Sequence, residues 1–221
     1  MKIPPELAAR QRELAERVVV EDRLGDVRLV GGCDVSLRRS RRSADGAAAI
    51  VVLTFPGLEE VETATVRGRV EFPYVPGFLS FRELPLLKQA FETLKRRPDV
   101  LLTDGQGLAH PRRFGLACHV GLEFDLPTIG CAKSRLCGEF EPFEWRKGAR
   151  SPLVVDGETV GCAVCTRDGV KPVFVSPGHR VSRETAVEIA LRCCPRYRVP
   201  EPIRLAHSRS RLALAIPETA C

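Results

Sequence analysis

The chain has 221 residues, of which 44% are hydrophobic and 28% are charged, a balance that suits one globular domain with a substantial core. No apolar run approaches the roughly 18 residues of a membrane helix, and the N-terminus lacks the basic and apolar regions of a signal peptide. We therefore exclude membrane-spanning and secreted classes. We expect a cytoplasmic protein in which residues 1–221 form a single domain.

The charge balance is basic. The formal net charge is +6, with 34 Lys and Arg residues against 28 Asp and Glu residues. A basic cluster stands out at Arg38-Arg39-Ser40-Arg41-Arg42. Such charge permits binding to nucleic-acid phosphates, and a solvated loop would carry the same residues. Composition alone therefore leaves nucleic-acid binding open.

The chain contains nine cysteines. An odd number in a chain without a signal peptide argues for reduced thiols rather than a disulfide framework. Cys162 and Cys165 have the spacing of half a zinc site, and Cys193-Cys194 could supply the other half. However, the first pair lies in what reads as a strand, where residues three apart face opposite sides. Reduced thiols are the simpler interpretation.

The N-terminal part predicts a helix followed by strands. Pro4-Pro5-Glu6 opens the helix, whose apolar residues are spaced to pack on the domain. Strands are expected at 27–37, 47–54 and 61–67, and together they should form an antiparallel meander. The first strand carries Asp34 at its centre. A buried aspartate is costly unless it is paired or bound to a metal.

Glu83 lies near the start of the next predicted helix. With Ser80 it fits a capping box, which would give it a purely structural role. Pro85 weakens this interpretation, because a proline well inside a helix removes a hydrogen bond. We therefore expect the regular helix to start near Leu84, with Glu83 at its mouth.

The segment from Val100 to Arg113 combines a short buried strand with a polar end. Its apolar run stops at Asp104, and a glycine-rich turn, His110 and two arginines follow. This order is typical of a strand that delivers a carboxylate to its tip, where glycines let backbone approach a ligand. An ordinary loop with a capping aspartate would show the same order.

The C-terminal half adds further helices and strands. A helix can begin near Pro111, and a strand is expected at 127–132. Turn signals at Asp156-Gly157 and Asp168-Gly169 suggest one or two late hairpins. A helix capped by Ser182 should run to Cys193. The whole order implies an α/β fold, a mixed sheet with helices on its faces.

In such a sheet Asp34 and Asp104 are candidates for neighbouring central strands. With Glu83 they would form a cluster of three carboxylates. Carboxylate clusters bind hard divalent cations, and two metal ions about 4 Å apart can bind the attacking and leaving oxygens in phosphoryl transfer. This combination points to a phosphodiester hydrolase.

Six blocks of the sequence resemble, in order, those of the endonuclease V family of deoxyinosine-specific repair nucleases, which have a ribonuclease H-like fold. The resemblance covers nearly the whole chain. The blocks are Gly32-Cys-Asp34-Val-Ser, Pro73-Tyr-Val-Pro-Gly-Phe-Leu-Ser-Phe-Arg-Glu83, Thr103-Asp-Gly-Gln-Gly-Leu-Ala-His-Pro-Arg-Arg-Phe-Gly115, Pro127-Thr-Ile-Gly-Cys-Ala-Lys-Ser-Arg-Leu-Cys-Gly138, Lys171-Pro-Val-Phe-Val-Ser-Pro-Gly-His-Arg-Val-Ser182 and Arg204-Leu-Ala-His207.

The resemblance implies roles for the catalytic residues. Asp34, Glu83 and Asp104 would be the metal-binding carboxylates, and His207 would complete the site. Lys133 would steady the scissile phosphate or the attacking water, which suits a cation beside developing negative charge. The implied cofactor is Mg²⁺, with Mn²⁺ able to substitute.

The resemblance also implies how a lesion is recognised. Tyr74 would be a wedge that enters the duplex where the damaged base leaves the stack. For His110 we favour a supporting role, either near a phosphate or in organising its loop. Arg112 and Arg113 could contact phosphates or solvate a helix start. Six positions match the family's pocket for the flipped base: Gly77, Leu79, Gly105, Leu116, Gly130 and Leu136.

The implied function is a deoxyribonuclease V-type DNA repair endonuclease. It would cut the second phosphodiester bond on the 3′ side of deoxyinosine, leaving 3′-hydroxyl and 5′-phosphate ends. The expected partner is deoxyinosine-containing DNA, with no membrane and no obligate protein partner for a monomer. Two alternatives are cleavage of inosine-containing RNA and non-catalytic binding of inosine or branched DNA. The three retained carboxylates argue against the second.

Overall fold

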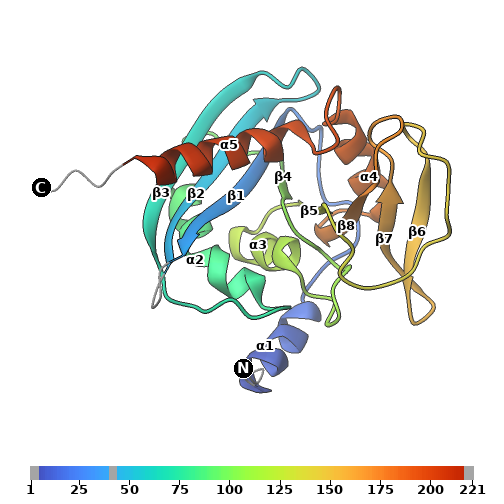
Figure 1. Ribbon diagram of the computed structural model, residues 1–221, viewed down its shortest axis with the longest axis horizontal. Helices are drawn as coiled ribbons and strands as arrows, with labels where there is room; N and C mark the ends of the chain where they lie inside the picture. The colour runs from blue at the N-terminus through green and yellow to red at the C-terminus, as the bar shows by residue number, and fades with distance from the viewer. Residues whose placement is uncertain (1–4, 40–43, 217–221) are drawn as a thin grey trace, which may run out of the picture.

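The computed structural model describes residues 5–39 and 44–216, where eight strands form one mixed sheet (Figure 1). Their order is β3-β2-β1-β4-β5-β8-β7-β6. The strands are β1 (Leu29–Arg39), β2 (Ala44–Thr54), β3 (Glu60–Val70), β4 (Val100–Thr103), β5 (Thr128–Ala132), β6 (Arg150–Val155), β7 (Glu158–Val164) and β8 (Val173–His179). The helices are α1 (Pro5–Ala15), α2 (Leu79–Glu92), α3 (Leu116–Phe124), α4 (Arg183–Arg192) and α5 (Glu201–Ala215). The predicted α/β class is confirmed.

Strands β1, β2 and β3 form the predicted antiparallel meander. β1 pairs with β2 from Leu29 opposite Thr54 to Arg39 opposite Ala44, so the strands extend further into the hairpin than expected. Ser40, Arg41 and Arg42 of the basic cluster lie outside the described residues. Residues 47–53 of β2 are fully buried. This continuous apolar run reflects a strand covered on both faces.

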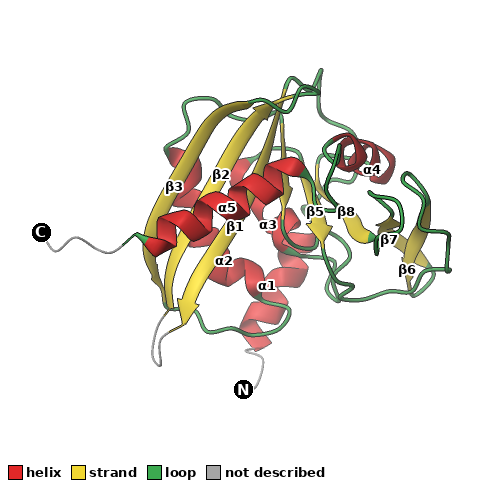
Figure 2. Cartoon of the chain, turned by 45° about the horizontal axis from the view of Figure 1, so that its top comes forward, coloured by secondary structure: helices red, strands yellow, loops and turns green. Residues whose placement is uncertain are grey.

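Helices cover both faces of the sheet. Figure 2 shows α5 crossing one face of the meander and α2 on its other face, where α3 lies beside α2 and packs on β5 and β8. One core includes residues of α4 and α5 packed on Val30, Val51 and Leu102. A second core packs α2 and α3 on Cys33 and Ile50. None of the described helices is long and apolar enough to cross a bilayer.

The late elements follow their turn signals. Asp156 and Gly157 both have positive φ, 53° and 81°, and they join β6 to β7 as a hairpin. Asp168-Gly169 lies in the connection between β7 and β8, which are also antiparallel. The Ser182 hydroxyl accepts a hydrogen bond from the Thr185 N–H and caps α4 as predicted. The eight cysteines in the described ranges are free.

Two helix starts differ from the predictions. α2 begins at Leu79 rather than Leu84 and contains Pro85, and its N-cap Phe78 makes no side-chain cap bond, so the capping box is not formed. Apolar burial of the helix outweighs the one hydrogen bond that Pro85 removes near its first turns. α3 begins at Leu116 rather than Pro111 because Arg113 has a φ of 54° and Gly115 is extended.

Candidate active site

Asp34 and Asp104 lie side by side at the centre of the sheet. β1 and β4 pair in parallel, with Cys33 opposite Thr103. Asp34 and Asp104 are the next residues on these two strands, and β4 ends at that point. The prediction of neighbouring central strands is confirmed. Asp34 and Asp104, 70 positions apart in sequence, thus lie together where the parallel pairing of β1 with β4 ends.

Asp34 is fixed by side chains from α5. His207 Nδ1 lies 3.2 Å from Asp34 Oδ2, and the buried Ser210 hydroxyl lies 2.6 Å from the same oxygen. The close packing of α5 depends on Gly32, since a Cβ there would lie 2.2 Å from the backbone of Pro202. Absence of a side chain at this position lets the helix carry His207 to the strand.

Glu83 approaches the two aspartates from α2 on the other face of the sheet. Burial, together with the charges of Asp34 and Asp104, raises the pKa of Glu83 to about 8, against a smaller lowering by Arg82. On the opposite side, Lys133 follows the end of β5 and forms an ion pair with Asp104. The three carboxylates therefore share a site with incomplete charge compensation.

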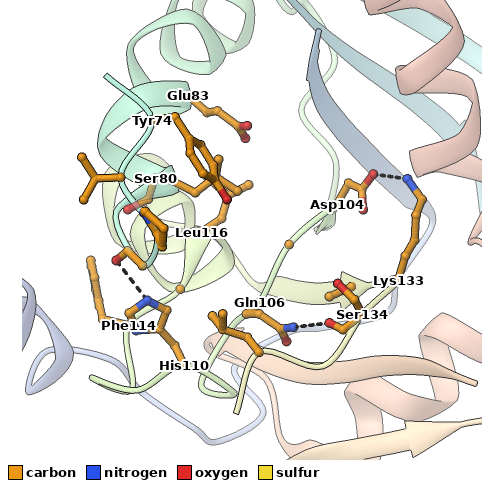
Figure 3. Close-up of a pocket in the computed structure, with 18 of the residues that line it drawn as sticks. Tyr74, Ser80, Glu83, Asp104, Gln106, His110, Phe114, Leu116, Lys133 and Ser134 are labelled. Carbon is orange, nitrogen blue, oxygen red and sulfur yellow. Dashed lines mark hydrogen bonds and ion pairs between the residues drawn. The ribbon is translucent and has the colours of Figure 1, made fainter. Parts of the chain in front are cut away.

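A cavity of about 440 Å³ lies beside these groups, within the size range of small-molecule sites. Figure 3 shows Glu83 and Asp104 at one end of it and Gln106 and His110 at the other. Tyr74 is 61% exposed, on the loop that joins β3 to α2. Most of the predicted site residues line this cavity: Asp34, Glu83, Asp104, Lys133, Tyr74, Gly77, Leu79, Gly105, Leu116, Leu136 and His110.

Two predicted site residues are not part of that lining. Gly130 in β5 packs behind the cavity wall, where a Cβ would lie 2.4 Å from the Gly107 backbone nitrogen. Gly130 thus supports the turn at residues 105–107 from behind, and its place in the base pocket stays a prediction. His207 is exposed and meets the site from the α5 side, through its contact with Asp34.

His110 is buried and supports its loop through both ring nitrogens. Nδ1 accepts a hydrogen bond from the Arg112 backbone N–H, and Nε2 lies 3.1 Å from the Gly77 carbonyl oxygen. Burial and the Arg112 charge lower the pKa of His110 to about 4, so the ring is neutral near pH 7. Nε2 then carries the proton and donates it to Gly77. This geometry agrees with the predicted supporting role.

The two arginines after His110 contact protein groups. Arg112 donates to Gln11 and to the Gly77 carbonyl, and its guanidinium lies 4.4 Å from the Phe78 ring centroid. Arg113 forms an ion pair with Glu158. Neither arginine lies at a helix start, since α3 begins at Leu116, and their contact with phosphates stays a prediction.

The Pro177–Arg180 block, for which the sequence suggested no chemistry, supports the glycine-rich turn from behind. The Pro177 carbonyl accepts from the Leu108 N–H at 2.9 Å. The Ser176 hydroxyl accepts from the Gly107 N–H at 2.8 Å. Both contacts fix the backbone between Asp104 and His110, and therefore the wall of the cavity.

Gln11 and Ser210 were not predicted to take part in the site. Gln11 is 1% exposed and sits within the apolar stripe of α1. A polar residue in such a stripe is the signal that could have marked it. Ser210 follows His207 by three positions, hence on the same face of a helix. α5 itself was not predicted, although buried residues at 203, 206, 210, 213 and 214 have helical spacing.

The donor set suits a hard divalent cation, since it consists of carboxylates with an excess of negative charge. Within the described residues, however, no three His, Cys, Asp or Glu side chains already form a metal-binding cluster. Metal ligation by Asp34, Glu83 and Asp104 thus stays a prediction, and the side chains would have to converge for it.

Comparisons with known proteins agree with this geometry. The family model described as Endonuclease V matches residues 12–208. Endonuclease V of Nostoc punctiforme is 48% identical over 200 residues, covering 89% of this chain and 88% of the relative. The crystal structure of endonuclease V from Streptomyces avermitilis superimposes with a TM-score of 0.89 at 42% identity, covering 96% of this chain and 94% of that one.

Two further structures bear on substrate and fold. Endonuclease V of Ciona intestinalis, in complex with a 24mer DNA containing an inosine followed by a ribo-adenosine, matches with a TM-score of 0.84 at 32% identity, covering 95% of this chain and 97% of that one. A. aeolicus Argonaute shares the fold at 15% identity, with a TM-score of 0.58, over 89% of this chain and 30% of that one. These matches confirm the ribonuclease H-like prediction. The chain belongs to the endonuclease V family.

Proposed function

We propose that this endonuclease acts on deoxyinosine-containing DNA and hydrolyses the second phosphodiester bond 3′ to the lesion, leaving 3′-hydroxyl and 5′-phosphate ends. The pairing of β1 with β4 carries the proposal, because it sets Asp34 beside Asp104 at the edge of a cavity. Glu83 and Lys133 border the same cavity. The inosine-containing DNA bound to the Ciona relative supports this choice of substrate.

Asp34, Glu83 and Asp104 would hold Mg²⁺, with Mn²⁺ able to substitute. Burial and the charges of Asp34 and Asp104 raise the pKa of Glu83, and this clustering of carboxylates supports a role for a divalent cation. When bound, the metal would supply electrostatic stabilisation of the phosphate and activation of the attacking water. His207 would keep Asp34 oriented, since the two side chains are 3.2 Å apart.

Lys133 would serve the scissile phosphate. Its ammonium group pairs with Asp104 at the cavity, and its side chain is 45% exposed, so a phosphate oxygen can reach it. If the Lys133 side chain moved from Asp104 to the substrate phosphate, its positive charge would lie where negative charge develops in the transition state. Neutral His110, with both ring nitrogens engaged by backbone, would act on the loop and not on the reacting atoms.

Recognition would precede this chemistry. Tyr74 is exposed at the cavity on a loop framed by Pro73 and Pro76, so its ring can stack where a base leaves the duplex. Hypoxanthine has a carbonyl and a ring N–H where adenine has an amino group and an acceptor. A cavity matched to hypoxanthine would leave polar groups unpaired with adenine.

Inosine-containing RNA is a second candidate substrate. The Ciona complex holds an inosine followed by a ribo-adenosine, and the 2′-hydroxyl is the group by which a protein separates the two nucleic acids.

Nicking of matched inosine-DNA, inosine-RNA and undamaged DNA, each with and without Mg²⁺, tests the proposal. We expect a metal-dependent cut in inosine-DNA at the second 3′ phosphodiester and no cut in the undamaged strand. Asp104→Ala should still bind inosine-DNA while its cleavage falls by about a hundredfold or more. Failure of the wild type to nick with either Mg²⁺ or Mn²⁺ would favour a non-catalytic inosine binder. Preference for the RNA strand would favour the second candidate.

A further inference from the structure

The carbonyl oxygen of Gly77 is the meeting point of three hydrogen-bond donors. Gln11 Nε2 donates at 3.0 Å, His110 Nε2 at 3.1 Å and an Arg112 terminal nitrogen at 2.7 Å. Gly77 belongs to the Tyr74 loop, residues 71–78 between β3 and α2. The donors come from α1 and from the segment between β4 and α3. We call this arrangement the Gly77 clamp, made of Gln11, His110 and Arg112 around one carbonyl.

Gln11 is the centre of the Gly77 clamp. Besides Gly77 it donates to the Phe114 carbonyl at 3.2 Å, and its Oε1 accepts from Arg112 Nε at 2.5 Å. Its side chain thus bonds to two segments that are far apart in the sequence, the Tyr74 loop and residues 112–114. A buried amide is stable only with such partners, because leaving them unmade costs the desolvation of each polar atom.

Arg112 uses the fork geometry that distinguishes arginine from lysine. Its Nε bonds to Gln11, a terminal nitrogen bonds to Gly77, and the guanidinium lies over the Phe78 ring. A lysine at this position could supply one of these contacts but not all of them at once. The arginine therefore ties α1 to Gly77 and Phe78, the last two residues before α2.

The backbone at Gly77 is suited to this arrangement. Its φ is 78°, in the region that favours glycine, and a Cβ there would lie 2.8 Å from Arg112. Any other residue at Gly77 would therefore strain the backbone and push the arginine away. The loop is thus shaped so that its carbonyl points at the donors while Tyr74, three residues earlier, stays exposed.

We propose that Gln11 and Arg112 are positioning residues that fix the Tyr74 loop against the cavity. Through Gln11, α1 thereby raises the affinity of the enzyme for the lesion. This rests on the wedge role proposed for Tyr74. A loop ordered before binding loses less conformational entropy when it enters the duplex. Loss of the Gly77 clamp should consequently weaken capture of the lesion in a duplex more than it slows the cut.

Two pairs of matched variants test the proposal. Gln11→Met keeps the length and volume of the side chain but removes its hydrogen bonds, and Gln89→Met makes the same change at an exposed position of α2. Arg112→Lys keeps the charge but not the fork, and Arg113→Lys is its control. The measurements are hydrogen exchange of residues 72–78 in the free protein, binding to inosine duplex and inosine single strand in EDTA, and the single-turnover nicking rate with saturating enzyme.

We expect faster exchange at 72–78 in Gln11→Met and Arg112→Lys, with both controls like the wild type. Duplex binding should weaken about tenfold and single-strand binding less than about threefold, while the nicking rate changes by less than about twofold. Unchanged exchange at 72–78, equal losses on both substrates, or a fall in the nicking rate alone would overturn the proposal. A Tyr74→Ala protein with normal duplex binding would instead overturn the wedge role, whatever the exchange shows.

Discussion

The Ser210 hydroxyl of α5 donates a hydrogen bond of 2.6 Å to the Asp34 carboxylate of β1, across 176 positions of sequence. The hydroxyl oxygen of Ser36, on the same strand, lies 2.8 Å from the Ser210 hydroxyl oxygen. With Ser36 donating to Ser210, the single Ser210 proton is directed at Asp34. The buried Ser210 hydroxyl and the half-buried Ser36 hydroxyl thus fix the orientation of one proposed metal ligand.

Ser210→Ala should therefore weaken cleavage at low Mg²⁺ concentrations, so that more Mg²⁺ is needed for the same rate. Removing a hydrogen bond that orients a ligand typically costs about 10- to 100-fold in metal affinity or activity. We expect the Mg²⁺ concentration for half-maximal nicking to rise about tenfold, measured by titration under single-turnover conditions. Ser208→Ala, exposed on the same helix, is the control. A Ser210→Ala protein with the Mg²⁺ dependence of the wild type would disprove the orienting role.

Glu83 should make the metal-free protein less stable as pH rises. Its pKa is raised from 4.5 to about 8, so between these values the folded protein keeps a proton that the unfolded chain has lost. Stability must fall with pH wherever the unfolded state binds fewer protons. Glu83→Gln, which cannot ionise, should lose less stability from about pH 5 to about pH 8, measured by urea unfolding in EDTA. Glu92→Gln, exposed on the same helix, should keep the slope of the wild type.

Tyr74→Ala should impair capture of inosine in a duplex more than in a single strand. Opening a base stack costs about a few kcal/mol, and stacking of the exposed Tyr74 ring can offset that cost. Only the duplex has such a stack to open. Tyr74→Phe keeps the ring and should bind like the wild type. Affinities measured by fluorescence anisotropy on both substrates decide the matter. Equal losses on the two would contradict a wedge.

Gly107→Ala should destabilise the fold. A Cβ at Gly107 would lie 2.1 Å from the Pro177 carbonyl oxygen, so β8 or the turn after β4 must shift. We expect a loss of about 2 kcal/mol in the free energy of unfolding, measured with urea. Gly25→Ala, where a Cβ meets nothing within 4 Å, is the control. Comparable stability of the two variants would refute the close approach.

The sheet and the pairing of the two aspartates could be predicted from sequence. Alternation, turn residues and the abrupt end of the strand before Asp104 are local signals, and they gave the meander and the neighbouring strands correctly. The first residue of each helix was harder to predict. Pro85 indicated a later start for α2, but packing of its apolar face overrides a single missing hydrogen bond.

The contacts that support the site could not be predicted in the same way. Gln11, Arg112 and Ser210 act across 35 to 176 positions of sequence, and no local pattern encodes which distant carbonyl or carboxylate they meet. Gly130 is a further example. A matching motif assigned this glycine to the base pocket, and the structure adds a packing role that the motif did not indicate, because the turn at Gly107 lies against its backbone.

Cys33 and Asp34 face opposite sides of the sheet, the first toward α2 and α3 and the second toward α5. The proposed catalytic groups accordingly come from both layers, with Glu83 from one and His207 from the other. A chain in which either helical layer has separated from the sheet lacks part of this set. With the roles proposed above, cutting of DNA would require both helical layers to be packed on the sheet at once, so activity would report assembly of the whole fold.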